Sequence, residues 1–391
     1  MRFSRTDRSL LAHWWTTVDR QLLTMILSLL AIGLLLSLAA SPAIAIKRGF
    51  PTYHFVERQA LFAVLAVGVL ITVSFLTPVQ IRRLALATFG LGLAGLIAVL
   101  LWGHEINGAR RWLPLLGQTL QPSEFAKPGF IVISAWLFAE TKRQPDMPAL
   151  AIVTGLAVLV ATLLVAEPDI GQTALVVTVW GALYVISGQP WLGALALAGL
   201  ATLGTGVAYM TFAHVQARFD QFFAHTLAGS SGDHSQIDRS LQAFAEGGFF
   251  GRGPGEGTVK TVLPDAHTDF IFAVVAEEYG IIACLALLAL FAAIAFKAIA
   301  RAGRETDSAN RLGVFGLVML FALQAVINMG VNVGLLPAKG MTLPFISAGG
   351  SSTLAVALTL GMLLGLTRRR TDLANLKKPP LVATTMLGDR S

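Results

Sequence analysis

Charge and cysteine are both scarce in this chain. Charged residues make up 13% of its 391 residues, while hydrophobic residues make up 55%. A typical soluble domain carries about 25% charged residues, so the composition argues against a soluble protein. Cys284 is the only cysteine. Neither a disulfide framework nor a cysteine-based metal centre can therefore exist within the chain.

Apolar runs of about 20 residues, the length that crosses a bilayer as a helix, recur along the sequence. They do not match the roughly 10-residue alternating segments of an outer-membrane barrel. We therefore predict an all-α, polytopic membrane protein. The first run is longer than the 7–15 residues typical of a signal-peptide core, so we read it as an uncleaved span. The predicted spans are 21–46, 58–77, 84–102, 122–141, 148–166, 170–187, 192–213, 269–296, 312–334 and 349–367.

Two of these spans, 148–166 and 170–187, are separated only by Glu167-Pro168-Asp169. That break could instead be a kink in one long helix, but about 40 residues far exceed a single bilayer crossing. We therefore expect two helices. The acidic residues Glu167 and Asp169 either only mark the helix break or place a carboxylate in an outer cavity. The sequence favours neither of these two interpretations.

Lysine and arginine set the expected orientation. A cytoplasmic N-terminus places most of the 29 basic residues on the inner side and, with ten spans, returns the C-terminus to that side. This predicts a multi-pass membrane protein with both termini on the cytoplasmic side. Residues 1–20 form a cytoplasmic segment, 21–368 the ten-span domain, and 369–391 a cytoplasmic tail. The net charge of +7 then reflects basic loops, so no nucleic-acid partner is expected.

One connection is far longer than the rest. Residues 214–268 form an outward-facing loop, whereas helix connections in bundles usually have about 2–8 residues. Its phenylalanines argue against disorder. The segment GGFFGRGPGEG (247–257) suits tight backbone turns or close approach to a ligand.

Basic and acidic side chains gather on the outer half. Glu124 and Lys127 are three residues apart at a helix start and share one face, so they could simply be an ion pair capped by Ser123. Arg110 and Arg111 lie nearby in sequence. Such a cationic cluster is also what a diphosphate or carboxylate ligand requires.

A second candidate region is LPAKGMTLPFISAGGSS (336–352), which contributes Lys339, Ser351 and Ser352. A Gly-Gly-Ser-Ser helix start can expose backbone N–H groups that favour anions. The glycine pair also permits close helix packing, so this signal is weak by itself.

The stretch LPDAHTDFIFAVVAEEYG (263–280) places several ionisable groups at the start of an apolar run. On a helix, Asp269 and Glu277 would lie about 80° apart and could line one cavity, with Glu278 on another face. A carboxylate near polar groups is a natural general base, especially where partial burial raises its pKa. We therefore expect an outer cavity with acids on one wall and basic groups on another.

Five motifs resemble, in order, those of the SEDS family of cell-wall proteins, which comprises FtsW and RodA. They are NGARRW, QPSEFAK, EPDIGQT, LPDAHTDFIFAVVAEE and GMTLPFISAGGSS. The stretch LPAKGMTLP is more similar to FtsW, the division member, than to RodA, the elongation member. Two departures are Ala348, where the family usually has tyrosine, and the looser stretch SQIDRSLQAFAEGG.

The resemblance implies a ten-span peptidoglycan glycosyltransferase that polymerises lipid II into glycan strands at the outer face during septal wall synthesis. It implies Asp269 as the essential aspartate, and Arg111 and Lys127 as functional residues. Its expected partners are a class B penicillin-binding protein, acting as transpeptidase, and other division proteins. A divalent cation, Mg²⁺ or Mn²⁺, is the one candidate cofactor. His267 could orient Asp269 or hold a loop.

Other functions compete with this reading. A lipid II flippase would also need a polar cavity, but its charged groups should be reachable from both leaflets, whereas the polar motifs here cluster on the outer side. An elongation-type polymerase is a second alternative. A scaffold that only recruits division proteins would give the intramembrane acids no purpose.

Overall fold

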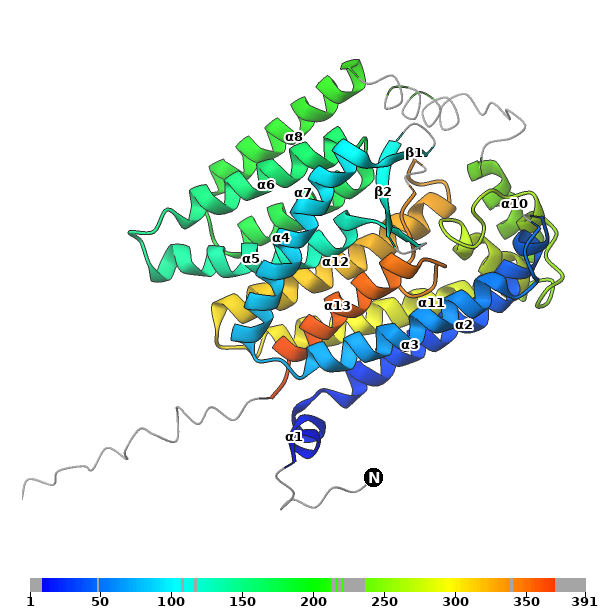
Figure 1. Cartoon of the computed structure of the whole chain (residues 1–391), viewed down its shortest axis with the longest axis horizontal. Helices are drawn as coiled ribbons and strands as arrows, with labels where there is room; N and C mark the ends of the chain where they lie inside the picture. Colours follow the sequence, from blue (N-terminus) through cyan, green and yellow to red (C-terminus); the bar gives the residue numbers. More distant parts are fainter. Residues whose placement is uncertain are drawn as a thin grey trace, which may run out of the picture.

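The computed structural model describes residues 9–47, 49–106, 109–115, 118–211, 216, 220, 236–337 and 340–369. Its helices form one elongated bundle, with both described chain ends at the same end of it (Figure 1). The helices are α1 Leu10–Thr17, α2 Arg20–Lys47, α3 His54–Ser74, α4 Pro78–Trp102, α5 Pro122–Arg143, α6 Ala149–Ala166, α7 Ile170–Ile186, α8 Trp191–Thr211, α10 Gln236–Gly247, α11 Ile271–Ala302, α12 Ser308–Asn332 and α13 Gly350–Leu366.

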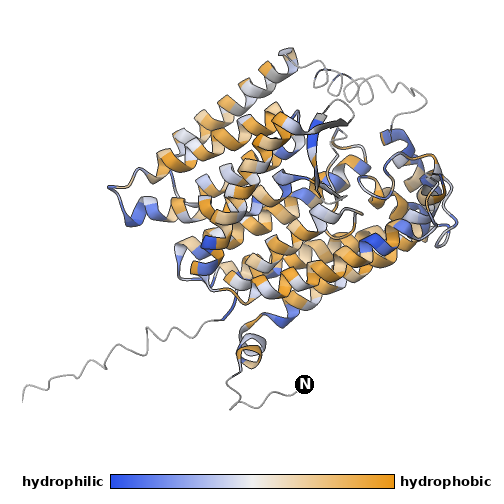
Figure 2. Cartoon of the chain, in the orientation of Figure 1, coloured by the Kyte–Doolittle hydropathy of each residue, from blue (hydrophilic) through white to orange (hydrophobic). Residues whose placement is uncertain are grey.

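Each of the ten predicted spans coincides with one helix, from α2 to α8 and from α11 to α13. Within the described residues, seven helices are long and apolar enough to cross a membrane, and α7 and α13 are shorter apolar helices. The remaining span, α5, carries Glu124, Lys127 and Glu140, all of them buried. The break at 167–169 separates α6 from α7, as expected. Polar residues gather at the ends of the bundle (Figure 2).

Three elements were not foreseen. Short helix α1 precedes the first span, and α10 lies within the long loop. Between α4 and α5 the chain forms an antiparallel sheet with strand order β1-β2-β3, where β1 is His104–Ile106, β2 Ala109–Leu115 and β3 Gln118–Leu120. The sheet stands at the end of the bundle opposite α1 (Figure 1). Strands β1 and β3 have three residues each, too few to show an alternating pattern, and the seven residues of β2, ARRWLPL, do not alternate strictly.

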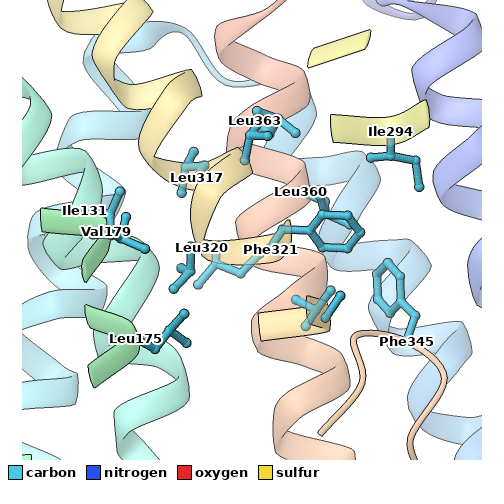
Figure 3. Packing of buried hydrophobic residues seen from close by; sticks show 14 of the residues in the cluster. Ile131, Leu175, Val179, Ile294, Leu317, Leu320, Phe321, Phe345, Leu360 and Leu363 are labelled. Atoms are coloured by element: carbon cyan, nitrogen blue, oxygen red, sulfur yellow. The ribbon is translucent and has the colours of Figure 1, made fainter. Parts of the chain in front are cut away.

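The core of the bundle is built around α5, which contacts α4, α7 and α12. Ile131 of α5 faces Leu175 and Val179 of α7, with Leu317 and Leu320 of α12 beside them (Figure 3). Glycines bring the backbones together. A Cβ added at Gly92 would lie 2.7 Å from the Cβ of Ala126, so α4 and α5 touch closely. This packing keeps the polar face of α5 at a fixed position.

Helix α11 is interrupted at Gly280, whose φ of 80° only glycine adopts readily. Backbone groups of the glycine-rich segment of the long loop form hydrogen bonds to α11 on both sides of the break. Ile281 N donates to Gly248 O over 2.9 Å, and Arg252 N donates to Glu277 O over 2.9 Å. The close approach predicted for residues 247–257 is thus made to a helix backbone. Irregular backbone at membrane depth requires this kind of internal partner.

Candidate active site

Asp269 lies in the turns directly before α11, and its backbone is held by α12. Its carbonyl oxygen accepts hydrogen bonds from Asn328 Nδ2 (2.8 Å) and Asn332 Nδ2 (2.9 Å). Asn332 also accepts, through Oδ1, a hydrogen bond from Ala273 N at the start of α11 (3.0 Å). Both asparagines are buried. The position of the aspartate is therefore fixed by side-chain amides.

The segment before α13 clasps the same turns from the other side. Ala348 N donates to His267 O (2.9 Å), and Ser347 Oγ donates to Thr268 O (2.5 Å). Asn328 Nδ2 donates to Met341 O (2.6 Å) as well, which ties both segments to α12. These bonds use backbone oxygens and leave the Asp269 carboxylate out of the clamp.

Lys127 is the centre of a second polar cluster, within the bundle. Its Nζ donates to Glu124 Oε1 (2.8 Å), to Gln172 Oε1 (2.6 Å) and to Gln324 Oε1 (3.4 Å). Gln172 Nε2 donates to the same Glu124 oxygen over 2.7 Å. The lysine side chain is only 3% exposed, so the expected ion pair exists and is buried. Helices α5, α7 and α12 all contribute to it.

Arg111 connects the small sheet to the α6–α7 break. From β2, its guanidinium donates to the carbonyl oxygens of Pro168 and Glu167, the latter over 3.4 Å. Its Nε lies 3.8 Å from Asp169 Oδ2. The other Asp169 oxygen accepts from Gln172 N over 3.3 Å and so caps α7. Asp169 therefore links Arg111 to the Lys127 cluster.

Burial and the charges of other site residues change the pKa of Asp269. Burial is the main cause that raises the pKa of Asp269, to about 7. The negative charges of Asp265 and Asp169 add to this rise, and the positive charge of Arg111 opposes it. A carboxyl group with a pKa near neutrality can accept a proton and release it again at physiological pH. The site thus combines a candidate general base with cationic groups.

Comparison with known proteins identifies the family of the chain. The family model described as "Cell cycle protein", which covers FtsW, RodA and SpoVE, matches residues 20–372. The chain belongs to the SEDS family. A probable peptidoglycan glycosyltransferase FtsW of Caulobacter vibrioides is 43% identical, with 94% of each chain covered. The corresponding protein of Alcanivorax borkumensis is 34% identical, over 92% of this chain and 95% of the relative.

Two solved SEDS-type structures share the fold. A chain from a peptidoglycan synthase complex that coordinates polymerization and crosslinking superposes with a TM-score of 0.71 at 27% identity, covering 90% of this chain and 97% of that one. The rod shape determining protein RodA of Thermus thermophilus gives a TM-score of 0.64 at 26% identity, with the same coverage. The polytopic helical fold expected from the motifs is confirmed.

Other predicted site residues of the SEDS chain lie apart from the Asp269 carboxylate. Glu277 Oε1 accepts from Thr258 N (2.5 Å) and Val259 N (2.7 Å), and Oε2 accepts from Lys260 N (3.1 Å). These bonds bind Glu277 to the 3₁₀ turn η1, Val259–Thr261. Glu278 forms a buried ion pair with Lys260. Both carboxylate oxygens of Glu277 are therefore held by the loop, and the cavity that it was expected to share with Asp269 stays a prediction.

The serines expected to bind substrate are in the first turn of α13. Both Ser351 and Ser352 are 8% exposed, and Ser352 Oγ donates to Gly349 O over 3.2 Å. His267 is buried beside Phe55, with ring centroids 5.1 Å apart, which agrees with its reading as a loop-holding residue. Lys339 lies outside the described residues. Direct substrate contacts by these residues remain predictions.

Sequence reasoning missed the neutral amides of the SEDS site. Gln324, Asn328 and Asn332 recur every four residues, so they form one polar stripe on α12 that faces Lys127, Met341 and Asp269 in turn. Their spacing in an otherwise apolar run was a readable signal, because polar groups at membrane depth need a reason. Attention to charged residues alone overlooked it.

The described residues offer no preformed group of protein ligands for the candidate divalent cation. Among the residues that the structure describes, no three histidine, cysteine, aspartate or glutamate side chains cluster closely enough to hold a metal ion. The described residues therefore do not fit a site in which protein ligands alone bind Mg²⁺ or Mn²⁺.

Proposed function

We propose that this chain is a peptidoglycan glycosyltransferase of the FtsW type that polymerises lipid II, with Asp269 as general base. The observation that carries the proposal is the placement of Asp269. Its backbone is fixed by Asn328, Asn332 and the segment before α13, while its carboxylate lies within the electrostatic reach of Arg111. The family and the names of its relatives supply the substrate class.

The reaction is a displacement at the anomeric carbon of the growing strand. The 4-hydroxyl of an acceptor lipid II attacks C1 of the sugar that carries undecaprenyl diphosphate. Asp269 takes the hydroxyl proton as the new C–O bond forms and the bond to the diphosphate breaks. One displacement converts the α-linkage into a β-linkage, so no covalent enzyme intermediate is needed. Asp269 then releases its proton to water.

Charge on the departing diphosphate requires stabilisation. Arg111 is the leading cationic candidate, because its positive charge lowers the pKa of Asp269. Lys127 is held by Glu124, Gln172 and Gln324, so part of its charge is already balanced. We propose that Arg111 contacts the diphosphate and that Lys127 keeps the inner wall of the site from being net negative.

A divalent cation remains part of the proposal only as a substrate-borne ion. Mg²⁺ is commonly held by one or two carboxylates together with substrate phosphates, and such binding needs no protein cage. If EDTA leaves the polymerisation rate unchanged at saturating lipid II, this part of the proposal fails.

The proposed setting is the division septum in the inner membrane, with both termini cytoplasmic. The proposed partners are a class B penicillin-binding protein, which cross-links the strands, and other division proteins. One solved neighbour is a synthase complex that combines polymerization with crosslinking, which supports a transpeptidase partner. Co-purification of the chain with such a transpeptidase, and faster polymerisation in the pair, test this assignment.

The decisive experiment uses purified protein, with its transpeptidase partner, and fluorescent lipid II. We expect glycan strands from the wild type and none above background from Asp269→Ala. If the variant polymerises at the wild-type rate, the general-base assignment is wrong. If the wild type makes no strands but moves lipid II across vesicle membranes, the chain is a flippase instead.

A further inference from the structure

A basic cavity lies at the end of the bundle opposite the proposed active site. Its volume is about 450 Å³, within the roughly 300–1,000 Å³ of typical small-molecule sites. Four chain segments line it: the end of α1 with the two residues that follow it, the first turn of α2, the end of α11 with Arg304 just beyond it, and the residue that follows Arg368. Its cationic lining residues are Arg20, Lys297, Arg301, Arg304 and Arg369.

Only one acid among the lining residues opposes these cations. Asp19 accepts from Arg301 Nε over 2.5 Å, and the two side chains are 4% and 17% exposed. The carboxylate of Asp19 thereby balances the positive charge of Arg301. None of the other four cations pairs with a carboxylate of the described part of the chain. The cavity therefore keeps an excess of positive charge.

Neutral groups fix two of these cations in place. Lys297 Nζ donates to the side-chain oxygen of Gln21. Arg20 Nε donates to Trp15 O over 3.1 Å, and its guanidinium lies 5.0 Å from the centre of the Trp15 ring. These contacts orient the cationic side chains without neutralising them. Such an arrangement is suited to an external anion.

The neighbouring helix α1 indicates the depth of the cavity in the membrane. Helix α1 lies at the end of the bundle (Figure 1). Its residues Leu10 and Leu11 are 84% and 59% exposed. Trp14 anchors α1 to the bundle, since its Nε1 donates to Ser74 Oγ over 2.9 Å. A short helix that exposes leucines and carries tryptophans close to basic residues is typical of the membrane interface. The cavity then lies at the level of lipid headgroups.

We propose that this cavity binds the phosphodiester headgroup of an anionic phospholipid of the inner leaflet. Basic pockets between membrane helices on the cytoplasmic side bind such headgroups. The inference does not depend on the proposed function, because it uses residues at the other end of the bundle.

The test measures lipid retained by the full-length protein. The protein is extracted in mild detergent, exposed to equal amounts of phosphatidylglycerol and phosphatidylcholine, and analysed by native mass spectrometry. The test variant is Arg304→Gln/Arg369→Gln. The matched control is Arg82→Gln/Arg83→Gln, which removes the same charge near the start of α4, outside the cavity lining. The melting temperature of each variant reports whether it folds.

We expect the wild type and the control to retain one phosphatidylglycerol in preference to phosphatidylcholine. The test variant should bind it about thirtyfold more weakly, as the loss of two cations near an anionic headgroup predicts. Failure of the wild type to prefer phosphatidylglycerol would overturn the proposal, as would an equal loss in the control. If Arg304→Gln/Arg369→Gln does not fold, Arg304→Lys/Arg369→Lys replaces it and should retain the lipid.

Two competition arms identify the source of the anion. Inorganic phosphate at millimolar concentration should leave the bound phosphatidylglycerol in place. Displacement by phosphate would mean a generic anion site and would overturn the lipid assignment. Displacement by a soluble acidic peptide at micromolar concentration would overturn it too and would indicate a protein partner.

Discussion

At the residue scale, the site rests on amides that hold charges in place. Asn328 and Asn332 fix the backbone of Asp269, and Gln172 and Gln324 share the ammonium group of Lys127. Neutral amides can serve as both donor and acceptor, so they satisfy buried polar atoms without adding charge. Of these side chains, only the charged ones, Asp269 and Lys127, could be anticipated from sequence motifs.

The pH dependence of polymerisation should follow Asp269. Burial raises the pKa of Asp269 to about 7, so its basic form is lost as the pH falls through that value. We expect the rate to fall about tenfold per pH unit below the midpoint. The charge of Asp265 contributes to the raised pKa. Asp265→Asn should therefore move the midpoint to lower pH while keeping the maximal rate, whereas an unmoved midpoint would show that another group titrates.

The Lys127–Glu124 pair should show the cost of an unbalanced buried charge. Lys127→Met leaves Glu124 buried with Gln172 as its remaining bonded side chain, and we expect about 3–5 kcal/mol of destabilisation. Lys127→Met/Glu124→Gln removes both charges and should recover most of that loss. Thermal unfolding in detergent measures both variants. A double variant no more stable than the single one would contradict this account.

At the scale of elements, the long loop completes a helix. Helix α11 is broken at Gly280, and the loop segment 247–253 supplies backbone partners on both sides of the break. The same loop returns through η1, where Glu277 accepts its N–H groups. Loop and helix thereby form one unit directly after Asp269, which explains how loop residues 236–268 are held against the bundle.

Gly280→Ala should disrupt this unit. An added Cβ would lie 2.2 Å from Phe249 O, and the φ of 80° is strained for alanine. We expect a lower melting temperature and reduced polymerisation, because the turns that carry Asp269 would shift with α11. Gly90→Ala is the matched control, since a Cβ added there, on the exposed surface of α4, would meet nothing within 4 Å. Equal effects of both substitutions would refute a special role for Gly280.

At the scale of the whole molecule, charge is divided between the two ends of the bundle. One end carries the sheet and α10, and the other carries α1 (Figure 1). The basic cavity is lined by residues at the end of α1 and the start of α2. Apolar helices join the ends, and their outer faces expose many leucines, such as Leu61, Leu91 and Leu195. Those exposed apolar faces suit a lipid environment.

The orientation can be tested with single introduced cysteines. Cys284 is buried and should give no background labelling. Tyr53→Cys lies between α2 and α3 at the predicted outer end, and Arg83→Cys lies near the start of α4 at the predicted inner end. A membrane-impermeant maleimide added to intact spheroplasts should label Tyr53→Cys and spare Arg83→Cys. The reverse pattern would invert the predicted topology.

The sequence by itself determined the helical class, the ten spans and the candidate charged groups, because hydrophobic length and local motifs are properties of short segments. Tertiary structure decided which groups from distant segments meet. It brought Arg111, Asp169 and Asp269 within electrostatic reach from segments more than 50 residues apart, and it gave Glu277 to η1. A helical wheel fixes the direction of a side chain, but its partner depends on packing between helices. That packing also formed the basic cavity, whose lining comes from segments at both ends of the chain and from α11.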